Sequence, residues 1–182
     1  VGTVCLLAMR YINGEDLHSL VANSGRLTRA KSIDIVRQTA RGLKHIHEHG
    51  LVHRDIKPAN VMLGYDGIVR ILDLGLASLR PVEQPEITRP GEILGTVDYM
   101  APEQVEHAAT VDSRADIYSL GCVLYYLLTG APAFARHGSV MARLLRRITC
   151  PFPEVCQSIC GESDVAEVLA RMTYSEPSQR FQ

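Results

Sequence analysis

The longest helical pattern in the chain lies between Thr28 and Gly50. Apolar residues recur there at steps of three and four, the spacing of one helix face: Ile33, Val36, Ala40, Leu43 and Ile46. Thr28 can cap the N-terminus of this helix, and Gly50 suits its C-terminal end. The pattern therefore predicts a long amphipathic helix that leads directly to residue 53.

A second stretch, residues 113–129, is apolar on nearly every face. Ser113 can cap it and Gly130 can close it, so we expect a helix buried at the centre of the fold. Shorter helical patterns are present in three further places: residues 15–21, 139–148 and 164–173.

Strand-like patterns are few. Residues 6–11 read as a strand that leads into a turn-like hinge at 12–14. Two short apolar runs, 61–63 and 68–72, flank a turn that contains an Asp-Gly pair, which is typical of a hairpin. Together the patterns predict an α+β fold that is mainly helical, with one hinge strand and one small β-hairpin.

Composition and charge limit the classes of function. The 182 residues are 46% hydrophobic and 21% charged, which is ordinary for a single soluble domain. A net charge of −1 gives no electrostatic reason to expect nucleic acid or an anionic membrane as a partner. The longest apolar stretch, residues 117–128, is too short for a bilayer, which takes about 20 residues. A membrane tether is therefore expected only outside this chain.

Two groups of potential metal ligands are better explained as structure. The five cysteines have no C-x-x-C spacing, and zinc binding by three of them lacks a regularly spaced fourth ligand: Cys150, Cys156 and Cys160. Reduced thiols in a cytoplasmic domain fit this pattern. Three histidines alternate near the end of the long helix, where they suit the helix dipole and do not share a face: His45, His47 and His49.

The most informative stretch, residues 53–60, reads His-Arg-Asp-Ile-Lys-Pro-Ala-Asn. A hydroxyl that attacks a nucleotide γ-phosphate needs a carboxylate beside it, and Mg²⁺ needs oxygen ligands. Asp55 can supply the carboxylate and Asn60 a metal ligand, while Lys57 can neutralise charge on the transferring phosphate. Beyond the predicted hairpin, Asp73 can supply a second metal ligand. The spacing therefore predicts a phosphoryl-transfer site.

Four ordered blocks resemble the protein kinase family. They are the loop at 53–60, Asp-Leu-Gly at 73–75 in place of Asp-Phe-Gly, Gly-Thr-Val-Asp-Tyr-Met-Ala-Pro-Glu at 95–103, and Asp-Ile-Tyr-Ser-Leu-Gly at 116–121. A closing Pro-Ser-Gln-Arg at 177–180 extends the resemblance over essentially the whole chain, in a style similar to bacterial Ser/Thr kinases. The resemblance implies ATP and Mg²⁺ as cofactors, and proteins that carry Ser or Thr as substrates.

The family's N-terminal lobe has no counterpart in the sequence. No G-x-G-x-x-G occurs among the 14 glycines, and no strand with a V-A-I-K-like lysine precedes residue 53. A first residue of valine also suggests a chain cut from a longer protein. We therefore expect residues 1–182 to be a partial kinase domain, hinge and C-terminal lobe, with the activation segment at 73–103. Such a fragment is expected to be inactive alone.

The resemblance also implies residues that bind the nucleotide. Met9 matches the gatekeeper position, and Met62 would form the floor of the pocket. The backbone of Arg10 and Ile12 would face adenine, and Asp16 would contact the ribose. Ordinary core packing is the alternative for the two methionines.

Structural roles are implied for residues outside the loop. Asp116 is expected to hold the turn at His53 and Arg54 by hydrogen bonds, since a buried carboxylate needs such donors. Glu103 and Arg180 resemble the family's buried ion pair.

Two threonines are expected to be regulatory. Thr96 fits the position whose hydroxyl bonds the catalytic aspartate in Ser/Thr kinases, and with Lys57 it argues against a tyrosine kinase. A phosphate on Thr88 would pair with Arg54, although Thr88 can equally be a plain loop residue.

Two rival functions stay open. A pseudokinase-like interaction module would use the helical lobe only to bind partners, but every catalytic position present is intact. A small-molecule phosphotransferase of similar fold typically lacks the Ala-Pro-Glu at 101–103. The preferred hypothesis is a Ser/Thr protein kinase.

Overall fold

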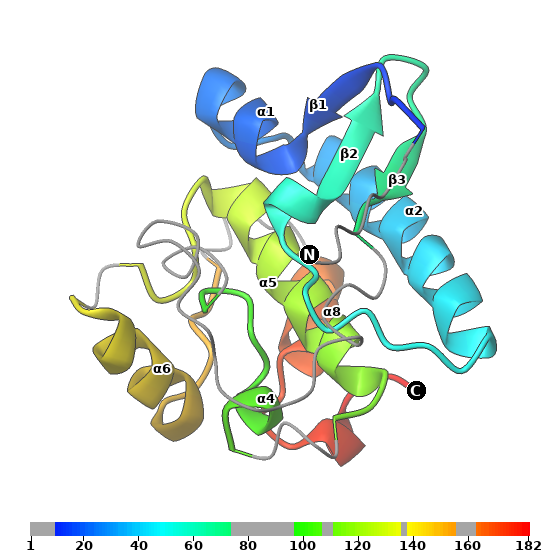
Figure 1. Cartoon of the computed structure of the whole chain (residues 1–182). Helices are drawn as coiled ribbons and strands as arrows, with labels where there is room; N and C mark the ends of the chain where they lie inside the picture. The colour runs from blue at the N-terminus through cyan, green and yellow to red at the C-terminus, as the bar shows by residue number, and fades with distance from the viewer. Residues whose placement is uncertain (1–9, 74–96, 107–110, 136–137, 156–162) are drawn as a thin grey trace, which may run out of the picture.

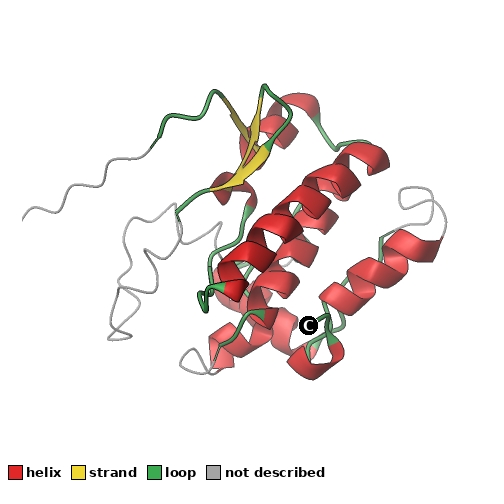
Figure 2. Cartoon of the chain, turned by 90° about the vertical axis from the view of Figure 1, so that its right-hand side faces the viewer, coloured by secondary structure: helices red, strands yellow, loops and turns green. Residues whose placement is uncertain are grey.

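The computed structural model of the chain describes residues 10–73, 97–106, 111–135, 138–155 and 163–182 (Figure 1). Within them, helices form the body of the molecule, and a three-stranded antiparallel sheet of order β1-β2-β3 lies at one end of it (Figure 2). The architecture is α+β and mainly helical, which confirms the fold class predicted from the sequence.

Helix α5, Arg114–Thr129, runs through the middle of the fold and is buried on nearly every face. Helix α2, Arg29–Glu48, packs along α5, and helix α8, Ser163–Met172, packs on α5 as well. The core therefore forms around α5, because only a helix that is apolar all round can be covered on several sides.

The ends of α5 differ in one detail from the prediction. Ser113 occupies the N-cap position, but its side chain makes no capping hydrogen bond. Instead, Asp112 Oδ1 accepts a hydrogen bond from the Arg114 N–H at 2.9 Å. At the other end Gly130 has a φ of 80°, a left-handed conformation that glycine adopts without a steric penalty.

Helix α2 confirms the longest predicted helix. Thr28 Oγ1 accepts from the Lys31 N–H at 3.4 Å, and Gly50 lies just beyond the C-terminus with a φ of 72°. Three residues of its apolar face are buried: Ile35, Leu43 and Ile46. Ile33 was predicted on this face but is 39% exposed, because it borders a groove rather than the core.

The elements before α2 differ from the sequence prediction. Strand β1 covers Gly14–Asp16, where the pattern indicated a hinge followed by a helix. Helix α1, Leu17–Ser24, starts two residues later than predicted because Asp16 caps it. The Asp16 carboxylate accepts from the Ser19 N–H at 2.9 Å and from the Ser19 hydroxyl at 2.7 Å. Strong local capping therefore decides this boundary.

The predicted hairpin is confirmed as β2, Val61–Gly64, and β3, Val69–Ile71, paired antiparallel. Strand β1 adds to the other edge of β2. Of the strand predicted at residues 6–11, only the last two residues are described, and they carry no strand. The short 3-10 helix η1, Pro58–Asn60, leads directly into β2.

The remaining elements follow α5 or precede it. Helix α4 covers Pro102–Glu106, and helix α6, Val140–Thr149, begins after Ser139, whose hydroxyl accepts from the Ala142 N–H at 3.3 Å. The short helix η3, Pro177–Gln179, follows α8. The predictions for α6 and α8 are confirmed to within one residue at each end. Among the helices described, none has the length and apolarity needed to span a membrane.

Packing of α8 on α5 leads to a prediction at Gly121. A Cβ at this position would lie 2.6 Å from Thr173 Cγ2 and 3.0 Å from Met172 Cβ. We expect Gly121→Ala to lower the free energy of unfolding by about 1–3 kcal/mol through overpacking. Gly42→Ala in α2 is the control, because its Cβ would meet only the flexible Ile71 side chain, at 3.0 Å.

Urea unfolding followed by circular dichroism measures both variants. In the control, the alanine's better helix propensity, worth up to about 1 kcal/mol, should offset the small adjustment of Ile71. Equal stability of the Gly121→Ala variant and the wild type would contradict the close packing of α5 and α8.

Candidate active site

The loop at residues 53–60 leaves α2 and is held from the core by one side chain of α5. Asp116 is fully buried and accepts hydrogen bonds from the His53 N–H at 2.9 Å and the Arg54 N–H at 2.8 Å. His47 Nε2, near the end of α2, lies 2.8 Å from the same carboxylate. A buried carboxylate requires partners of this kind. The start of the loop is thereby attached to the core.

Arg54 has a left-handed backbone with a φ of 66°, which costs a non-glycine residue about 1–2 kcal/mol. Its N–H is bonded to Asp116, and its carbonyl accepts from Gln104 Nε2 at 2.9 Å. Gln104 Oε1 accepts in turn from the Ala101 N–H at 2.9 Å. Gln104 was not predicted, because a single glutamine after Pro-Glu carries no distinguishing pattern. It connects the loop at 53–60 with the segment at 97–101.

Asp55 presents the partly exposed carboxylate of the loop. Its Oδ2 lies 2.8 Å from Lys57 Nζ and accepts from Asn60 Nδ2 at 3.0 Å. The same Nδ2 donates to the Asp55 carbonyl at 2.8 Å. Because these contacts use the amide nitrogen of Asn60, its carbonyl oxygen is the atom that can ligate a cation. The structure therefore brings the predicted base, cation and first metal ligand together.

Buried His53 connects Asp55 with the residue before Asp73. His53 Nδ1 accepts from the Asp55 N–H at 3.3 Å, so Nε2 carries the proton and donates to the Leu72 carbonyl at 2.8 Å. The Leu72 N–H donates to the Asn60 carbonyl at 2.8 Å. Asp73 follows directly, exposed and with a φ of 56°. Oxygen ligands from these two adjoining segments fit Mg²⁺, which prefers carboxylate and carbonyl oxygens.

The predicted nucleotide-binding residues lie near the small sheet. Met62 is half-buried in β2, opposite Asp16 of β1. The Asp16 carboxylate caps α1, so a ribose hydroxyl would share it with that cap. Arg10 is exposed and Ile12 half-buried, both outside any strand. Three predicted site residues lie outside the described part of the chain: Met9, Thr88 and Thr96.

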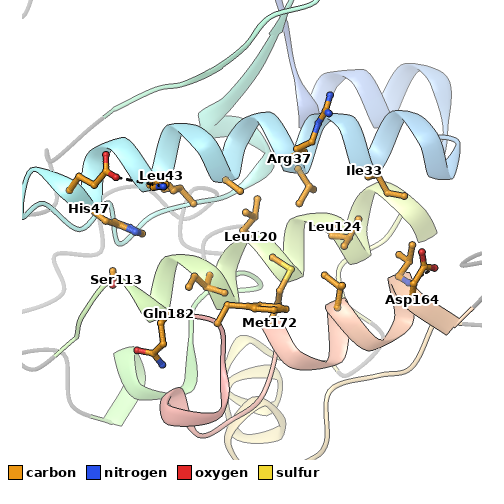
Figure 3. Close-up of a pocket in the computed structure, with 18 residues that line it drawn as sticks. Ile33, Arg37, Leu43, His47, Ser113, Leu120, Leu124, Asp164, Met172 and Gln182 are labelled. Atoms are coloured by element: carbon orange, nitrogen blue, oxygen red, sulfur yellow. Dashed lines mark hydrogen bonds and ion pairs between the residues drawn. The ribbon is translucent and has the colours of Figure 1, made fainter.

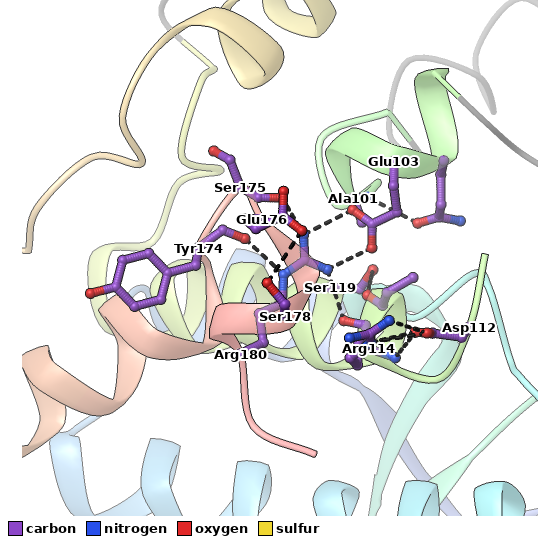
Figure 4. Close-up of polar contacts among 12 residues, drawn as sticks. Ala101, Glu103, Asp112, Arg114, Ser119, Tyr174, Ser175, Glu176, Ser178 and Arg180 are labelled. Atoms are coloured by element: carbon purple, nitrogen blue, oxygen red, sulfur yellow. Dashed lines mark hydrogen bonds and ion pairs between the residues drawn. The ribbon is translucent and has the colours of Figure 1, made fainter. Parts of the chain in front are cut away.

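A buried ion pair connects α4 with the C-terminal part of the chain (Figure 4). Arg180 Nη1 and Nη2 bind the two carboxylate oxygens of Glu103 at 2.6 and 2.8 Å. The other guanidinium donors bind three backbone carbonyl oxygens: those of Tyr174, Ser175 and Arg114. All donors of this arginine are therefore satisfied, and a fork-shaped, charge-assisted contact anchors α4.

A large apolar groove lies elsewhere, between α2, α5 and α8 (Figure 3). It has a volume of about 830 Å³, and residues such as Leu43, Leu120 and Met172 line it. The loop at 53–60 contributes nothing to its walls, so this groove is distinct from the predicted phosphoryl-transfer site. His47 belongs to both regions, since it lines the groove and contacts Asp116.

Comparison with known proteins identifies the class to which this geometry belongs. The family model described as "Protein kinase domain" matches residues 2–182. The chain therefore belongs to the protein kinase family, and the predicted kinase-like fold is confirmed.

Among curated proteins, the chain is similar to serine/threonine-protein kinases of bacteria. It is 32% identical to PknB of Mycolicibacterium smegmatis over 181 residues, which are 100% of this chain and 29% of that protein. It is 31% identical over 181 residues to PknB of Mycobacterium tuberculosis strain H37Rv, again 29% of that protein. It is 35% identical to "Serine/threonine-protein kinases PknA" of Corynebacterium glutamicum over 179 residues, 98% of this chain and 37% of that protein. The chain spans about a third of the length of these relatives.

The attachment of the loop to Asp116 can be tested by Asp116→Asn. This substitution turns one carboxylate oxygen into an amide that faces an N–H donor. We expect the free energy of unfolding to fall by about 2–3 kcal/mol, since a buried donor loses its acceptor. Asp112→Asn is the matched control, because Asp112 is exposed and pairs with Arg114 at 2.6 Å on the surface.

Such surface pairs contribute about 0–1 kcal/mol, and asparagine also caps helices well. Thermal unfolding of both variants provides the measurement. Equal losses of unfolding free energy in Asp116→Asn and Asp112→Asn would show that the buried carboxylate does not stabilise the attachment of the loop to the core.

Proposed function

We propose that this chain is the catalytic, C-terminal lobe of a Ser/Thr protein kinase that transfers the γ-phosphate of Mg·ATP to protein hydroxyl groups. The observation that carries the proposal is the arrangement of Asp55, Lys57 and Asn60 on a turn that Asp116 attaches to the core. Phosphoryl transfer depends mainly on positioning and charge stabilisation, which such an attached turn can provide.

In the proposed reaction, the substrate hydroxyl lies beside the Asp55 carboxylate, which accepts its proton. The hydroxyl oxygen forms a bond to the γ-phosphorus while the bond from that phosphorus to the bridging oxygen breaks, and ADP leaves with the electron pair. Lys57, 2.8 Å from Asp55, reduces the negative charge on the transferring group. Asn60 and Asp73 would hold Mg²⁺, which offsets charge on the phosphates when bound.

The relatives' names support the choice of protein substrates, since those proteins are called serine/threonine-protein kinases. The preferred alternative from the sequence, a pseudokinase-like module, would need a lost catalytic position. Asp55, Lys57, Asn60 and Asp73 are all present in this sequence. The kinase proposal therefore fits the residues better than an interaction module does.

The proposal includes an N-terminal lobe outside these 182 residues, with the glycine-rich loop and the phosphate-binding lysine. The hinge would bind adenine through the backbone of Arg10 and Ile12, with Met9 and Met62 in the pocket. The domain would act in the cytoplasm.

Regulation of the proposed kinase would lie in the segment at 73–103. Phosphate on Thr88 would pair with Arg54, and the Thr96 hydroxyl would bond Asp55. Thr88 and Thr96 lie outside the described residues, so their support is the motif order in the sequence.

The catalytic assignment is tested in a complete kinase domain that carries this chain. Asp55→Asn removes the proton acceptor and Asp73→Asn a metal-ligating charge, so each should lower the rate of peptide phosphorylation at least about a hundredfold. Asp66→Asn is the control, since Asp66 lies in the exposed hairpin turn and pairs with Arg70 at 2.7 Å. A radiolabelled-ATP assay measures all three, and near-wild-type activity of Asp55→Asn would refute the assignment.

The 182-residue chain on its own gives a second prediction. It contains only one face of the proposed nucleotide site, so it should neither phosphorylate protein nor bind Mg·ATP with the affinity of a complete kinase. Calorimetric titration with Mg·ATP and a kinase assay on the purified chain measure both properties. Micromolar binding together with turnover would contradict the division of the site between two lobes.

A further inference from the structure

Two arginines occupy the inner face of α6. Arg143 and Arg147 are one helical turn apart, and they are only 9% and 1% exposed. Helix α6 lies beside α4 (Figure 1). Both side chains contact the segment at 97–101, which precedes α4. An amphipathic helix normally buries apolar residues on this face. The burial of two cations here is therefore unusual.

Arg147 contacts the backbone of the segment, and Arg143 contacts one of its side chains. Arg147 Nη2 donates to the Asp98 carbonyl at 2.7 Å, and Nη1 donates to the Met100 carbonyl at 3.0 Å. The guanidinium also lies 5.1 Å from the ring centre of Phe134. Arg143 Nη1 binds the Asp98 carboxylate at 2.9 Å. The planar guanidinium of Arg147 thus spans the carbonyl oxygens of Asp98 and Met100, which are two residues apart.

Burial of these charges carries a desolvation cost. Within the described residues, Arg143 forms the only ion pair with Asp98, and no carboxylate lies within 4.0 Å of the Arg147 guanidinium. Asp98 Oδ1 and Arg147 Nε have no hydrogen-bond partner in the same part of the chain. Burial also raises the pKa of Asp98, although both arginines act to lower it. Apolar side chains of similar size would often be as stable or more stable here, so the cations call for another reason.

The segment held by Arg147 lies against the catalytic loop. Tyr99 and Met100 share a small cavity with Arg54 and Asp55. The next residue, Ala101, is linked to the loop through Gln104, which accepts from the Ala101 N–H and donates to the Arg54 carbonyl. A polypeptide whose hydroxyl reaches Asp55 must therefore run next to this segment.

We propose that Arg147, assisted by Arg143, is a positioning residue for the protein substrate: it fixes the segment at 97–101 as the surface on which the substrate backbone lies beside Asp55. This inference rests on the proposed kinase function and adds a determinant of substrate affinity to it. ATP would lie toward the sheet and the hinge, so affinity for ATP does not depend on Arg147.

The test uses Arg147→Met in a complete kinase domain, with peptide and ATP varied separately. Methionine keeps most of the side-chain volume but cannot donate to the two carbonyl groups. We expect the KM for peptide to rise about tenfold, since a lost buried hydrogen bond of 1–2 kcal/mol corresponds to about this factor. The KM for ATP and the rate of ATP hydrolysis without peptide should stay within about twofold.

Two further variants separate positioning from folding. Arg147→Lys keeps the charge but not the fork, so its KM for peptide should fall between those of the wild type and Arg147→Met. Arg146→Met is the matched control, because Arg146 lies on the exposed face of the same helix and should leave both KM values unchanged. If Arg147→Met does not fold, the test is made on Arg147→Lys, whose KM for peptide should rise while its KM for ATP stays unchanged.

The outcomes are distinct. An active domain whose KM for peptide is unchanged in Arg147→Met and Arg147→Lys overturns this inference and leaves the proposed kinase function intact. A lower kcat at unchanged KM for both substrates also overturns it, because that result indicates only a smaller folded fraction. A wild-type domain that phosphorylates no peptide overturns the proposed function and this inference with it.

Discussion

The buried carboxylate of Asp116 is the contact on which the candidate site depends. A carboxylate buried in the first turn of α5 is tolerated only when donors surround it, because burying an unpaired charge costs several kcal/mol. Its donors are the backbone N–H groups of His53 and Arg54, together with the His47 side chain. The packing of α2 on α5 and the shape of the turn at His53 and Arg54 therefore depend on the same carboxylate. A change that shifts α2 relative to α5 should also move the loop.

Backbone strain is found at the same place. Arg54 and Asp73 are the two non-glycine residues of the described chain with positive φ, at 66° and 56°. Such conformations persist only when surrounding contacts determine them, and they gather at functional sites. Asp116 and Gln104 hold Arg54 on both sides, while the neighbour of Asp73, Leu72, is held at both its N–H and its carbonyl. The strain thus falls on the residue before the proposed base and on one of the proposed metal ligands itself.

Local patterns predicted the elements whose signals are local. The period of apolar residues located α2, all-round apolarity located α5, and the Asp-Gly turn located the hairpin, while the order of motifs predicted Asp55 and Asn60 as site residues. Where two local signals competed, the period failed: Asp16 caps α1, which moved the helix start and left the preceding residues free to pair as β1. Gln104 and Arg147 were not found, because their partners are distant in the chain and an arginine in a helical pattern reads as a solvent-facing residue.

Two buried arginines from the C-terminal half hold α4 and the segment just before it, and both lie over one aromatic ring. The guanidinium carbons of Arg147 and Arg180 lie 5.8 and 5.0 Å from the ring centre of Tyr118 on α5. Arg180 has a carboxylate partner, Glu103, and every donor is used, which describes a permanent anchor. Arg147 donates to two carbonyl oxygens and contacts Cys122 Sγ at 3.5 Å, but within the described residues it has no carboxylate partner and its Nε is unused. The contact at α4 is therefore an ion pair between two charged side chains, whereas the contact at 98–100 joins a cation to neutral carbonyl oxygens. Removal of Glu103 would therefore leave the buried Arg180 charge without its carboxylate partner, whereas the segment at 97–101 depends on the direction of hydrogen bonds from the Arg147 fork.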